Sequence, residues 1–156
     1  MTESTVPNYP RRITSDQVWA AIRELGYNFH TMATKGVDIY DESCKRRLTE
    51  IDLLLENNEC CMAVEVKPKP TEKDIAHHIR QLELLRDCLE KRQQQPKRIL
   101  GAIAGAVFPE GIQQAVIEAG LYVIEQSGDT MKISVPEGFT PVRGKGGQSK
   151  NNASSL

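Results

Sequence analysis

The chain has no excess of positive charge and few aromatic residues. Its formal net charge is -1 over 156 residues, so it lacks the overall basic surface that attracts nucleic acid through charge alone. Aromatic residues make up only 5% of the sequence, which argues against a single-strand binder built on base stacking. The phosphate-loop pattern Gly-x4-Gly-Lys-Ser/Thr is also absent. Any binding of phosphate must therefore be local or assisted by a metal ion.

The four cysteines lack the spacing of a zinc site. Cys44, Cys60, Cys61 and Cys88 form no Cys-x-x-Cys pair, and no histidine lies at zinc-ligand spacing from them. Neighbouring Cys60 and Cys61 would point to opposite faces of a strand. We therefore expect buried, reduced cysteines in a cytoplasmic protein. No apolar run approaches the roughly 20 residues of a membrane span, and the amino terminus lacks the apolar core of a signal peptide.

The length suits one domain, because 156 residues bury one core but not two. Residues 1–12 contain two prolines and an arginine pair and are predicted to form a flexible arm. Residues 143–156 have almost no apolar content and are predicted to be disordered. The folded domain is then expected at residues 13–142.

The hydrophobic pattern predicts alternating helices and strands. The expected helices span residues 14–25, 71–92 and 109–119; the expected strands lie within 29–40 and at 48–55, 60–66, 99–108, 121–125 and 131–135. Thr71 is expected to cap the second helix with Asp74, and Gly26 to end the first. The order is a helix, three strands, a helix, a strand, a helix and a terminal hairpin. It predicts an α/β fold with a mixed central sheet flanked by helices.

Carboxylates and a lysine fall on neighbouring predicted strands. Glu50 and Asp52 share one face of their strand, while Ile51, Leu53 and Leu55 share the other; in the next strand Glu65 and Lys67 share a face. The hairpin between the two strands would place Asp52 beside Glu65. Two close carboxylates repel unless a cation lies between them, and hard oxygen ligands suit Mg²⁺ or Mn²⁺. Lys67 could then orient or deprotonate an attacking water, or stabilise charge developing on a phosphorus.

A Glu-x-Lys tripeptide alone carries little information, since about one is expected by chance in a chain of this composition. The alternative is that these charged side chains form the solvent-exposed face of an antiparallel hairpin. The protein would then be a plain interaction module that binds no metal. Against this, Val64 and Val66 flank the pair, and the long helix that follows must pack on this sheet. A half-buried carboxylate and lysine at such a place need a reason.

The arrangement of these motifs resembles a known superfamily. The stretch Glu50-Ile-Asp52 … Ala63-Val-Glu65-Val-Lys67, followed by a Thr-capped helix, resembles the PD-(D/E)XK nucleases. Two later stretches, Gly101-Ala-Ile-Ala-Gly105 and Gly120-Leu-Tyr-Val-Ile, resemble a branch of that superfamily that is common in cyanobacteria. The likeness covers about residues 15–142, and its carboxy-terminal part is more specific than the loose superfamily motif.

The resemblance implies a restriction-endonuclease-like core and a divalent-metal-dependent DNA endonuclease that hydrolyses phosphodiester bonds. It implies Asp52 and Glu65 as metal ligands, with the backbone carbonyl of Val66 as a further ligand and Mg²⁺ or Mn²⁺ as the cofactor. It implies Lys67 as the catalytic lysine. Cutting both strands of a duplex would require two such sites and hence a homodimer. The alternative is a nuclease-like domain that no longer cuts and that binds nucleic acid or protein.

Further residues are candidates for supporting roles. Many superfamily members add an acid from the first helix, where Glu24 is the candidate, and some bring a glutamine of the later helix to the site, where Gln81 is the candidate. The adjacent His77 and His78 point about 100° apart on a helix, so both cannot easily join one site. One of them could contact phosphate, but a surface position is expected. The basic residues Lys45, Arg46, Arg47, Lys69 and Lys73 could hold a DNA backbone, although a solvated loop would show the same pattern.

Overall fold

The computed structural model describes residues 12–92, 97–136 and 138–141. Its helices are α1 (Ser15–Ile22), the 3-10 helix η2 (Arg23–Leu25), α2 (Glu72–Lys91) and α3 (Ile112–Glu118). Its strands are β1 (Thr31–Ala33), β2 (Val37–Tyr40), β3 (Arg47–Ile51), β4 (Leu53–Glu56), β5 (Cys60–Lys67), β6 (Arg98–Gly105), β7 (Tyr122–Ser127) and β8 (Thr130–Ser134). The expected arm, apart from Arg12, and the expected tail at 143–156 lie outside the described residues.

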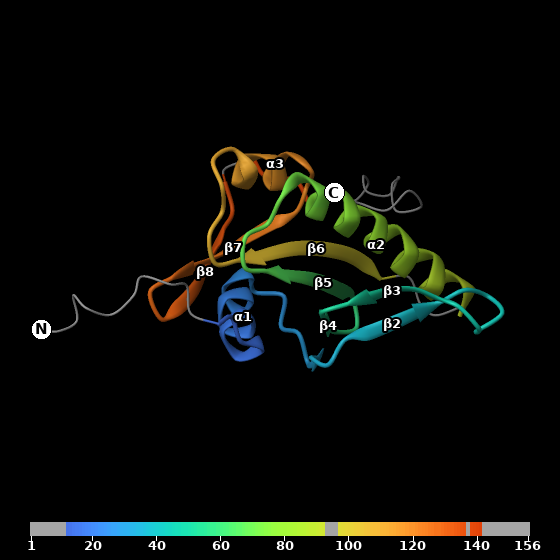
Figure 1. Ribbon diagram of the computed structural model, residues 1–156. Coiled ribbons are helices and arrows are strands. Elements are labelled where there is room, and N and C mark those ends of the chain that lie inside the picture. Colours follow the sequence, from blue (N-terminus) through green and yellow to red (C-terminus); the bar gives the residue numbers. More distant parts are fainter. Residues whose placement is uncertain (1–11, 93–96, 137, 142–156) are drawn as a thin grey trace, which may run out of the picture.

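A six-stranded mixed sheet forms the centre of the fold, in the order β1-β4-β5-β6-β7-β8. The neighbours β5, β6 and β7 run parallel, and the other pairs are antiparallel. The two parallel steps are crossovers through α2 and α3, which cover one face, while α1 covers the other (Figure 1). β2 and β3 form a separate two-stranded sheet. The predicted α/β class, with a mixed sheet between helices, is confirmed.

Local sequence signals set the ends of the helices. Thr14 caps α1 and Thr71 caps α2, each in a reciprocal capping box with the residue three positions later. Gly26 ends the first helical segment with φ of 81°, a left-handed conformation that glycine adopts without a steric penalty. The predicted cap at Thr71 and the predicted stop at Gly26 are confirmed.

Two hydrophobic clusters fill the two sides of the sheet. The α1-side cluster contains Val18, Ala21 and Ile22, and the α2-side cluster contains Ile75, Leu82 and Leu85. The central strand β5 contributes to both, because successive side chains of a strand point to opposite faces. Cys60 accordingly lies in the α1-side cluster and Cys61 in the α2-side cluster, as predicted. Cys44 is exposed, so the prediction of burial is wrong for that residue.

The strand expected at 48–55 is two strands, because the chain bends at Asp52. β3 before the bend pairs with β2, whereas β4 after it pairs with β1 and β5. Ile51 packs in the α2-side cluster, but Leu53 and Leu55 pack in the α1-side cluster. The prediction that these three side chains share one face is therefore wrong, and the physical reason is the change of sheet at Asp52.

Gly101 lets α2 approach β6 closely. A Cβ at this position would lie 2.7 Å from Cδ1 of Leu82 and 2.7 Å from Cδ2 of Leu121. At Gly105 the close neighbours are instead Pro70 and Phe108, which lie in loops. The lack of a side chain therefore allows a helix to approach the strand at Gly101, whereas at Gly105 it makes room for two loops.

Gly101→Ala is expected to lower the free energy of unfolding by about 1–3 kcal/mol, because the added methyl group overpacks this contact. Urea denaturation measures the loss. In the double variant with Leu82→Val, the smaller partner relieves the clash, so the double variant should cost less than the sum of the two single variants. Strictly additive costs would contradict the contact.

No helix in the described ranges is long and apolar enough to cross a membrane. The expected cytoplasmic location stays a prediction.

Candidate functional site

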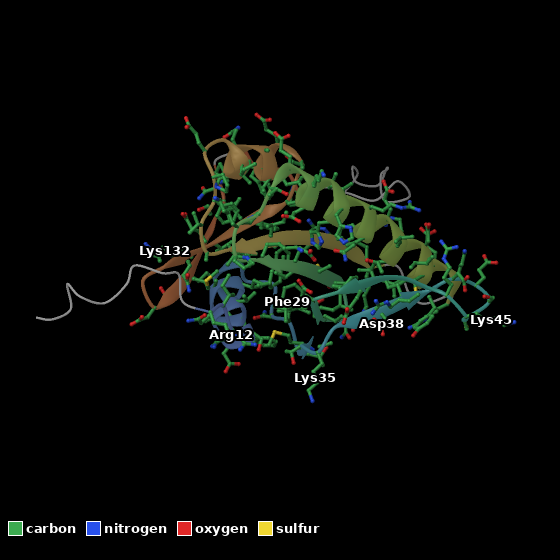
Figure 2. The ribbon with its side chains drawn as sticks, in the orientation of Figure 1. Arg12, Phe29, Lys35, Asp38, Lys45 and Lys132 are labelled. Carbon is green, nitrogen blue, oxygen red and sulfur yellow. The ribbon has the colours of Figure 1, made fainter. Side chains whose placement is uncertain are left out.

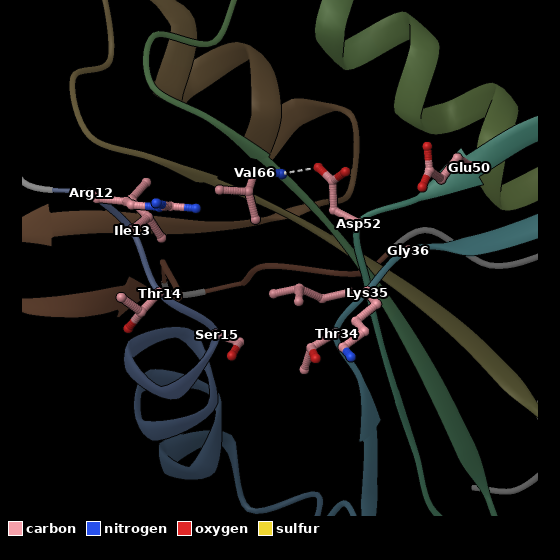
Figure 3. Close-up of a pocket in the computed structure, with 11 residues that line it drawn as sticks. Arg12, Ile13, Thr14, Ser15, Thr34, Lys35, Gly36, Glu50, Asp52 and Val66 are labelled. Atoms are coloured by element: carbon pink, nitrogen blue, oxygen red, sulfur yellow. Dashed lines mark hydrogen bonds between the residues drawn. The ribbon is translucent and has the colours of Figure 1, made fainter.

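The predicted carboxylates and lysine meet where β5 ends and the chain bends between β3 and β4. In the antiparallel β4–β5 pair, Leu53 lies opposite Val64, which places Asp52 next to Glu65. Oδ2 of Asp52 accepts a 2.8 Å hydrogen bond from the backbone N–H of Val66 (Figure 3). The side chain of Asp52 thus extends the pairing of β5 beyond the last residue of β4.

The same hydrogen bond shows where the Val66 carbonyl points. Within an extended strand, the N–H and the C=O of one residue point to the same edge. Because the Val66 N–H points to Asp52, the Val66 carbonyl oxygen lies on that edge as well, past the start of β4 at Leu53. The Val66 carbonyl, which is the third oxygen ligand that the resemblance implies, therefore lies on the edge of β5 that faces Asp52.

Glu65 is the buried acid of the site, with only 4% of its surface exposed. Burial, followed by the nearby charge of Asp52, raises the pKa of Glu65 to about 7, although Lys67 acts in the opposite direction. Nζ of Lys67 lies 3.7 Å from Oε2 of Glu65. The ionised form of Glu65 is thus destabilised in a way that a nearby cation would relieve.

A further acid, Asp74, belongs to the site, and the sequence reasoning had assigned it only a capping role. Its Oδ2 closes the capping box of α2 by accepting from the backbone N–H of Thr71, and its Oδ1 lies 3.8 Å from Nζ of Lys67. Lys67 is therefore held between one carboxylate on its own strand and one on the next helix. The signal for this role was the short connection between Lys67 and the Thr71 cap, which brings the first turn of α2 back to the end of β5.

Glu24 is not brought to the site. It lies exposed in η2, at the far end of the first helical segment from Ser15, which lines the same pocket as Asp52. Ser15 and Glu24 are separated along the helix axis by about 14 Å, from a rise of ~1.5 Å per α-helical residue and ~2.0 Å per 3-10 residue. The first helix thus supplies hydroxyl groups near Asp52 rather than an acid.

Gln81 and His78 form a buried network beneath the site instead of reaching the carboxylates. Nε2 of Gln81 donates to Oγ1 of Thr49 at 2.9 Å and to the backbone carbonyl of Glu50 at 2.8 Å. The His78 ring lies between Oε1 of Gln81, at 2.7 Å, and the backbone carbonyl of Ala63, at 3.0 Å. His78 has no exposed surface, so its predicted surface position is wrong, and burial lowers its pKa.

The network joins α2 to the two strands that carry the candidate ligands. Glu50 precedes Asp52 by two residues, and Ala63 precedes Glu65 by two residues. The network therefore holds each of the two segments at a point two residues before its acid. Gln81 and His78 are therefore positioning residues, which fix where the two carboxylates lie relative to each other.

The donor set suits Mg²⁺ or Mn²⁺. Mg²⁺ commonly keeps several waters and binds through one or two carboxylates together with substrate phosphates. Such a set is offered by Asp52, Glu65 and the Val66 carbonyl. Burial and the charge of Asp52 raise the pKa of Glu65, so a cation nearby would stabilise its ionised form. In the described part of the chain, no group of three or more His, Cys, Asp or Glu side chains could hold a metal ion. Water and substrate would have to complete the coordination.

The basic residues Lys45 and Arg47 belong to the β2–β3 hairpin and not to the end of β5. Lys45 is at the outer tip of the β2–β3 hairpin, on the opposite side of the molecule from Arg12 (Figure 2). Arg47 forms ion pairs of 3.4 Å with Asp38 and with Glu50 on the same hairpin.

Comparisons of the whole chain with protein-family models, with curated proteins and with solved structures find no match.

Proposed function

We propose that this protein is a divalent-metal-dependent DNA endonuclease of the PD-(D/E)XK type, with a restriction-endonuclease-like core within residues 13–142. The observation that carries the proposal is the buried Glu65, placed beside Asp52 at the end of a central strand and followed by Lys67 on the same face. A structural role does not require a charge there, since burial makes the ionised carboxylate unfavourable.

Asp52, Glu65 and the carbonyl of Val66 are the groups that would hold Mg²⁺ or Mn²⁺. When bound, such an ion polarises a phosphodiester and lowers the pKa of a coordinated water. The two carboxylates would then fix the reacting phosphate at the carboxyl end of β5. Because Glu65 is buried, the protein excludes bulk water from the side of the phosphate that faces Glu65.

Lys67 has the position of the catalytic lysine. Its ammonium group is within 4 Å of Glu65 and of Asp74, so two carboxylates hold it at the end of β5. From there it can orient the attacking water and stabilise the negative charge that develops on the phosphate oxygens. Asp74 acts through Lys67 and is a positioning residue.

The alternative is a nuclease-like domain that binds nucleic acid or protein without cutting. The observation that favours it is the absence of Glu24 from the site, which leaves the first helix without an acid next to Asp52. Binding of Mn²⁺ without cleavage, lost in Asp52→Ala, would support this alternative. DNA as a partner, and a homodimer for cutting both strands, belong to the same proposal.

The proposal is tested by incubating the protein with plasmid DNA and Mg²⁺ or Mn²⁺. Wild type is expected to nick or linearise the plasmid. Lys67→Ala is expected to lower the cleavage rate about 100-fold or more, because it removes the group that assists proton transfer and charge stabilisation. Binding of Mn²⁺, measured by calorimetry, should persist in this variant, because both carboxylates remain.

Lys132→Ala is the matched control, since Lys132 is an exposed lysine on the edge strand β8, three strands away from β5. It should leave the cleavage rate within about twofold of wild type, as ordinary surface substitutions do. Cleavage that survives in both Lys67→Ala and Asp52→Ala would overturn the mechanism. An absence of any metal binding by wild type would favour the plain interaction module.

A further inference from the structure

A pocket of about 640 Å³ opens directly beside the candidate metal ligands. It lies between the start of α1, the turn between β1 and β2, and the bend at Asp52 (Figure 3). Asp52 and Val66 form part of its wall, so whatever fills the pocket lies next to the candidate reaction centre. Its volume is within the usual range of small-ligand sites.

Two cations line this pocket from separate segments. Arg12 precedes α1, and Lys35 lies in the turn between β1 and β2 (Figure 3). Both are exposed, and within the described ranges neither forms an ion pair with a carboxylate. In contrast, Arg47 on the neighbouring hairpin is paired with Asp38 and Glu50. Because Glu50, which also lines the pocket, is paired with Arg47, the charges of Arg12 and Lys35 are available to an anion.

Hydroxyl groups add uncharged donors to the same wall. Thr14, Ser15 and Thr34 all line the pocket. Oγ1 of Thr14 accepts a hydrogen bond from the backbone N–H of Gln17, which leaves the hydroxyl proton of Thr14 free to be donated elsewhere. Arginine, lysine and hydroxyl groups together are the side chains that most often contact phosphate and sugar in nucleic-acid complexes.

Among the described residues that line it, the pocket has no aromatic side chain on which a base could stack. Its size admits the sugar and phosphate of one strand, not a whole duplex. The contacts that it offers are therefore contacts to the backbone of one strand, and these carry no sequence information.

We propose that this pocket holds the phosphodiester next to the scissile one in a single nucleic-acid strand, with Arg12 and Lys35 binding its phosphate. The proposal rests on the proposed function, because Asp52 and Val66 mark the reacting phosphate at one end of the pocket. It adds that the substrate strand is bound through its backbone, independently of sequence. It also assigns Arg12 and Lys35 as binding residues outside the metal centre.

The test compares Arg12→Gln, Lys35→Gln, the double variant and the control Lys45→Gln on a labelled single-stranded oligonucleotide. Each single substitution is expected to raise KM about tenfold, because it removes a charged hydrogen bond to phosphate. It should also lower the slope of log affinity against log salt by about one. The value of kcat and the affinity for Mn²⁺ should stay within about twofold of wild type. Lys45→Gln should change none of these quantities, because Lys45 lies at the far hairpin tip.

An unchanged KM and salt slope in the double variant would overturn the pocket assignment and leave the proposed function intact. A loss of Mn²⁺ affinity in the double variant would also overturn it, since the two cations would then act on the metal centre. If wild type cleaves nothing, the proposed function fails, and fluorescence anisotropy with the same oligonucleotide still decides the pocket assignment. Weaker binding by the double variant, with Lys45→Gln equal to wild type, supports it, whereas equal binding or no binding by wild type overturns it.

Discussion

Glu65→Gln is expected to stabilise the metal-free protein at pH 8 while abolishing its binding of Mn²⁺ and its cleavage of DNA. Burial and the charge of Asp52 raise the pKa of Glu65 from 4.5 to about 7. At 1.36 kcal/mol per pKa unit, the ionised side chain costs the folded state about 3 kcal/mol at pH 8. Glutamine has nearly the same shape and no charge, so most of this cost disappears. The lost carboxylate removes a ligand, and cleavage should fall about 1000-fold or more.

The dependence on pH gives this prediction a definite sign. Between pH 4.5 and about 7, folded Glu65 keeps a proton that the unfolded chain has already lost. The stability of the wild-type protein therefore falls as the pH rises through this window, and the loss is complete above pH 7. Glu65→Gln lacks this titration. Its stabilisation should be near zero at pH 4.5 and should grow to about 1–3 kcal/mol at pH 8, after a discount for burying the amide.

Urea denaturation in EDTA, at pH 4.5 and at pH 8, measures the effect. Glu83→Gln is the matched control, because Glu83 is an exposed glutamate on α2 paired with Arg80. Its free energy of unfolding should change by at most about 0.5 kcal/mol at either pH. Added Mn²⁺ should raise the melting temperature of wild type and of Glu83→Gln, but not of Glu65→Gln. An equal loss of stability for Glu65→Gln at both pH values would show that its charge is not the source of the strain.

The result would separate a functional acid from a structural one. A carboxylate retained for folding becomes more favourable when it ionises next to Lys67, whereas Glu65 becomes less favourable. Buried acids whose pKa is strongly shifted are concentrated at functional sites, so a charge that weakens the metal-free fold points to a use of that charge in binding. The stability of the apo protein therefore reports on the site without requiring that the substrate be known.

The parts of the fold that were predicted correctly depend on local chemistry. The cap at Thr71 is a contact between residues three positions apart, and the stop at Gly26 depends on a single backbone conformation. The pairing of Asp52 with Glu65 follows from a short hairpin, whose turn fixes the register. Each of these can be read from a few neighbouring residues.

The break at Asp52 could not be predicted in this way. Thr49, Ile51, Leu53 and Leu55 are all buried, so the alternation of a single strand runs through the break without interruption. The pattern records which side chains are buried, but not which hydrophobic cluster they enter. Only the tertiary pairing of β3 with β2 and of β4 with β5 separates the two halves.

The burial of His78 has a signal in the sequence, which is its position on the apolar stripe of α2. His78 and Gln81 are three residues apart on α2, and both fall beside Ile75 and Leu82 on its inner stripe. A histidine on such a stripe is buried when a partner accepts its N–H. That partner is the carbonyl of Ala63, fifteen residues away on β5. The sequence shows the pair on the helix, and only the fold supplies the acceptor.

Gln81→Leu is expected to lower the free energy of unfolding by about 2–4 kcal/mol, because it leaves two polar groups without their partner. Those groups are the hydroxyl of Thr49 and the backbone carbonyl of Glu50. The apolar surface gained by leucine offsets only part of this loss. Chemical denaturation measures it, and Thr49→Val, which removes one acceptor of the same amide, should cost about 1 kcal/mol.

The matched control is Gln114→Leu, because Gln114 is an exposed helical glutamine whose Nε2 bonds to Glu118 at 3.1 Å. Its effect on stability should be at most about 0.5 kcal/mol. Under conditions where Gln81→Leu remains folded, it should also bind Mn²⁺ more weakly and cleave with a lower kcat, while KM for the oligonucleotide is unchanged. A merely structural glutamine would lower stability and leave the affinity of the folded protein for Mn²⁺ as it was. Because Glu50 and Ala63 each lie two residues before a proposed metal ligand, a network that positions the site must change both quantities together.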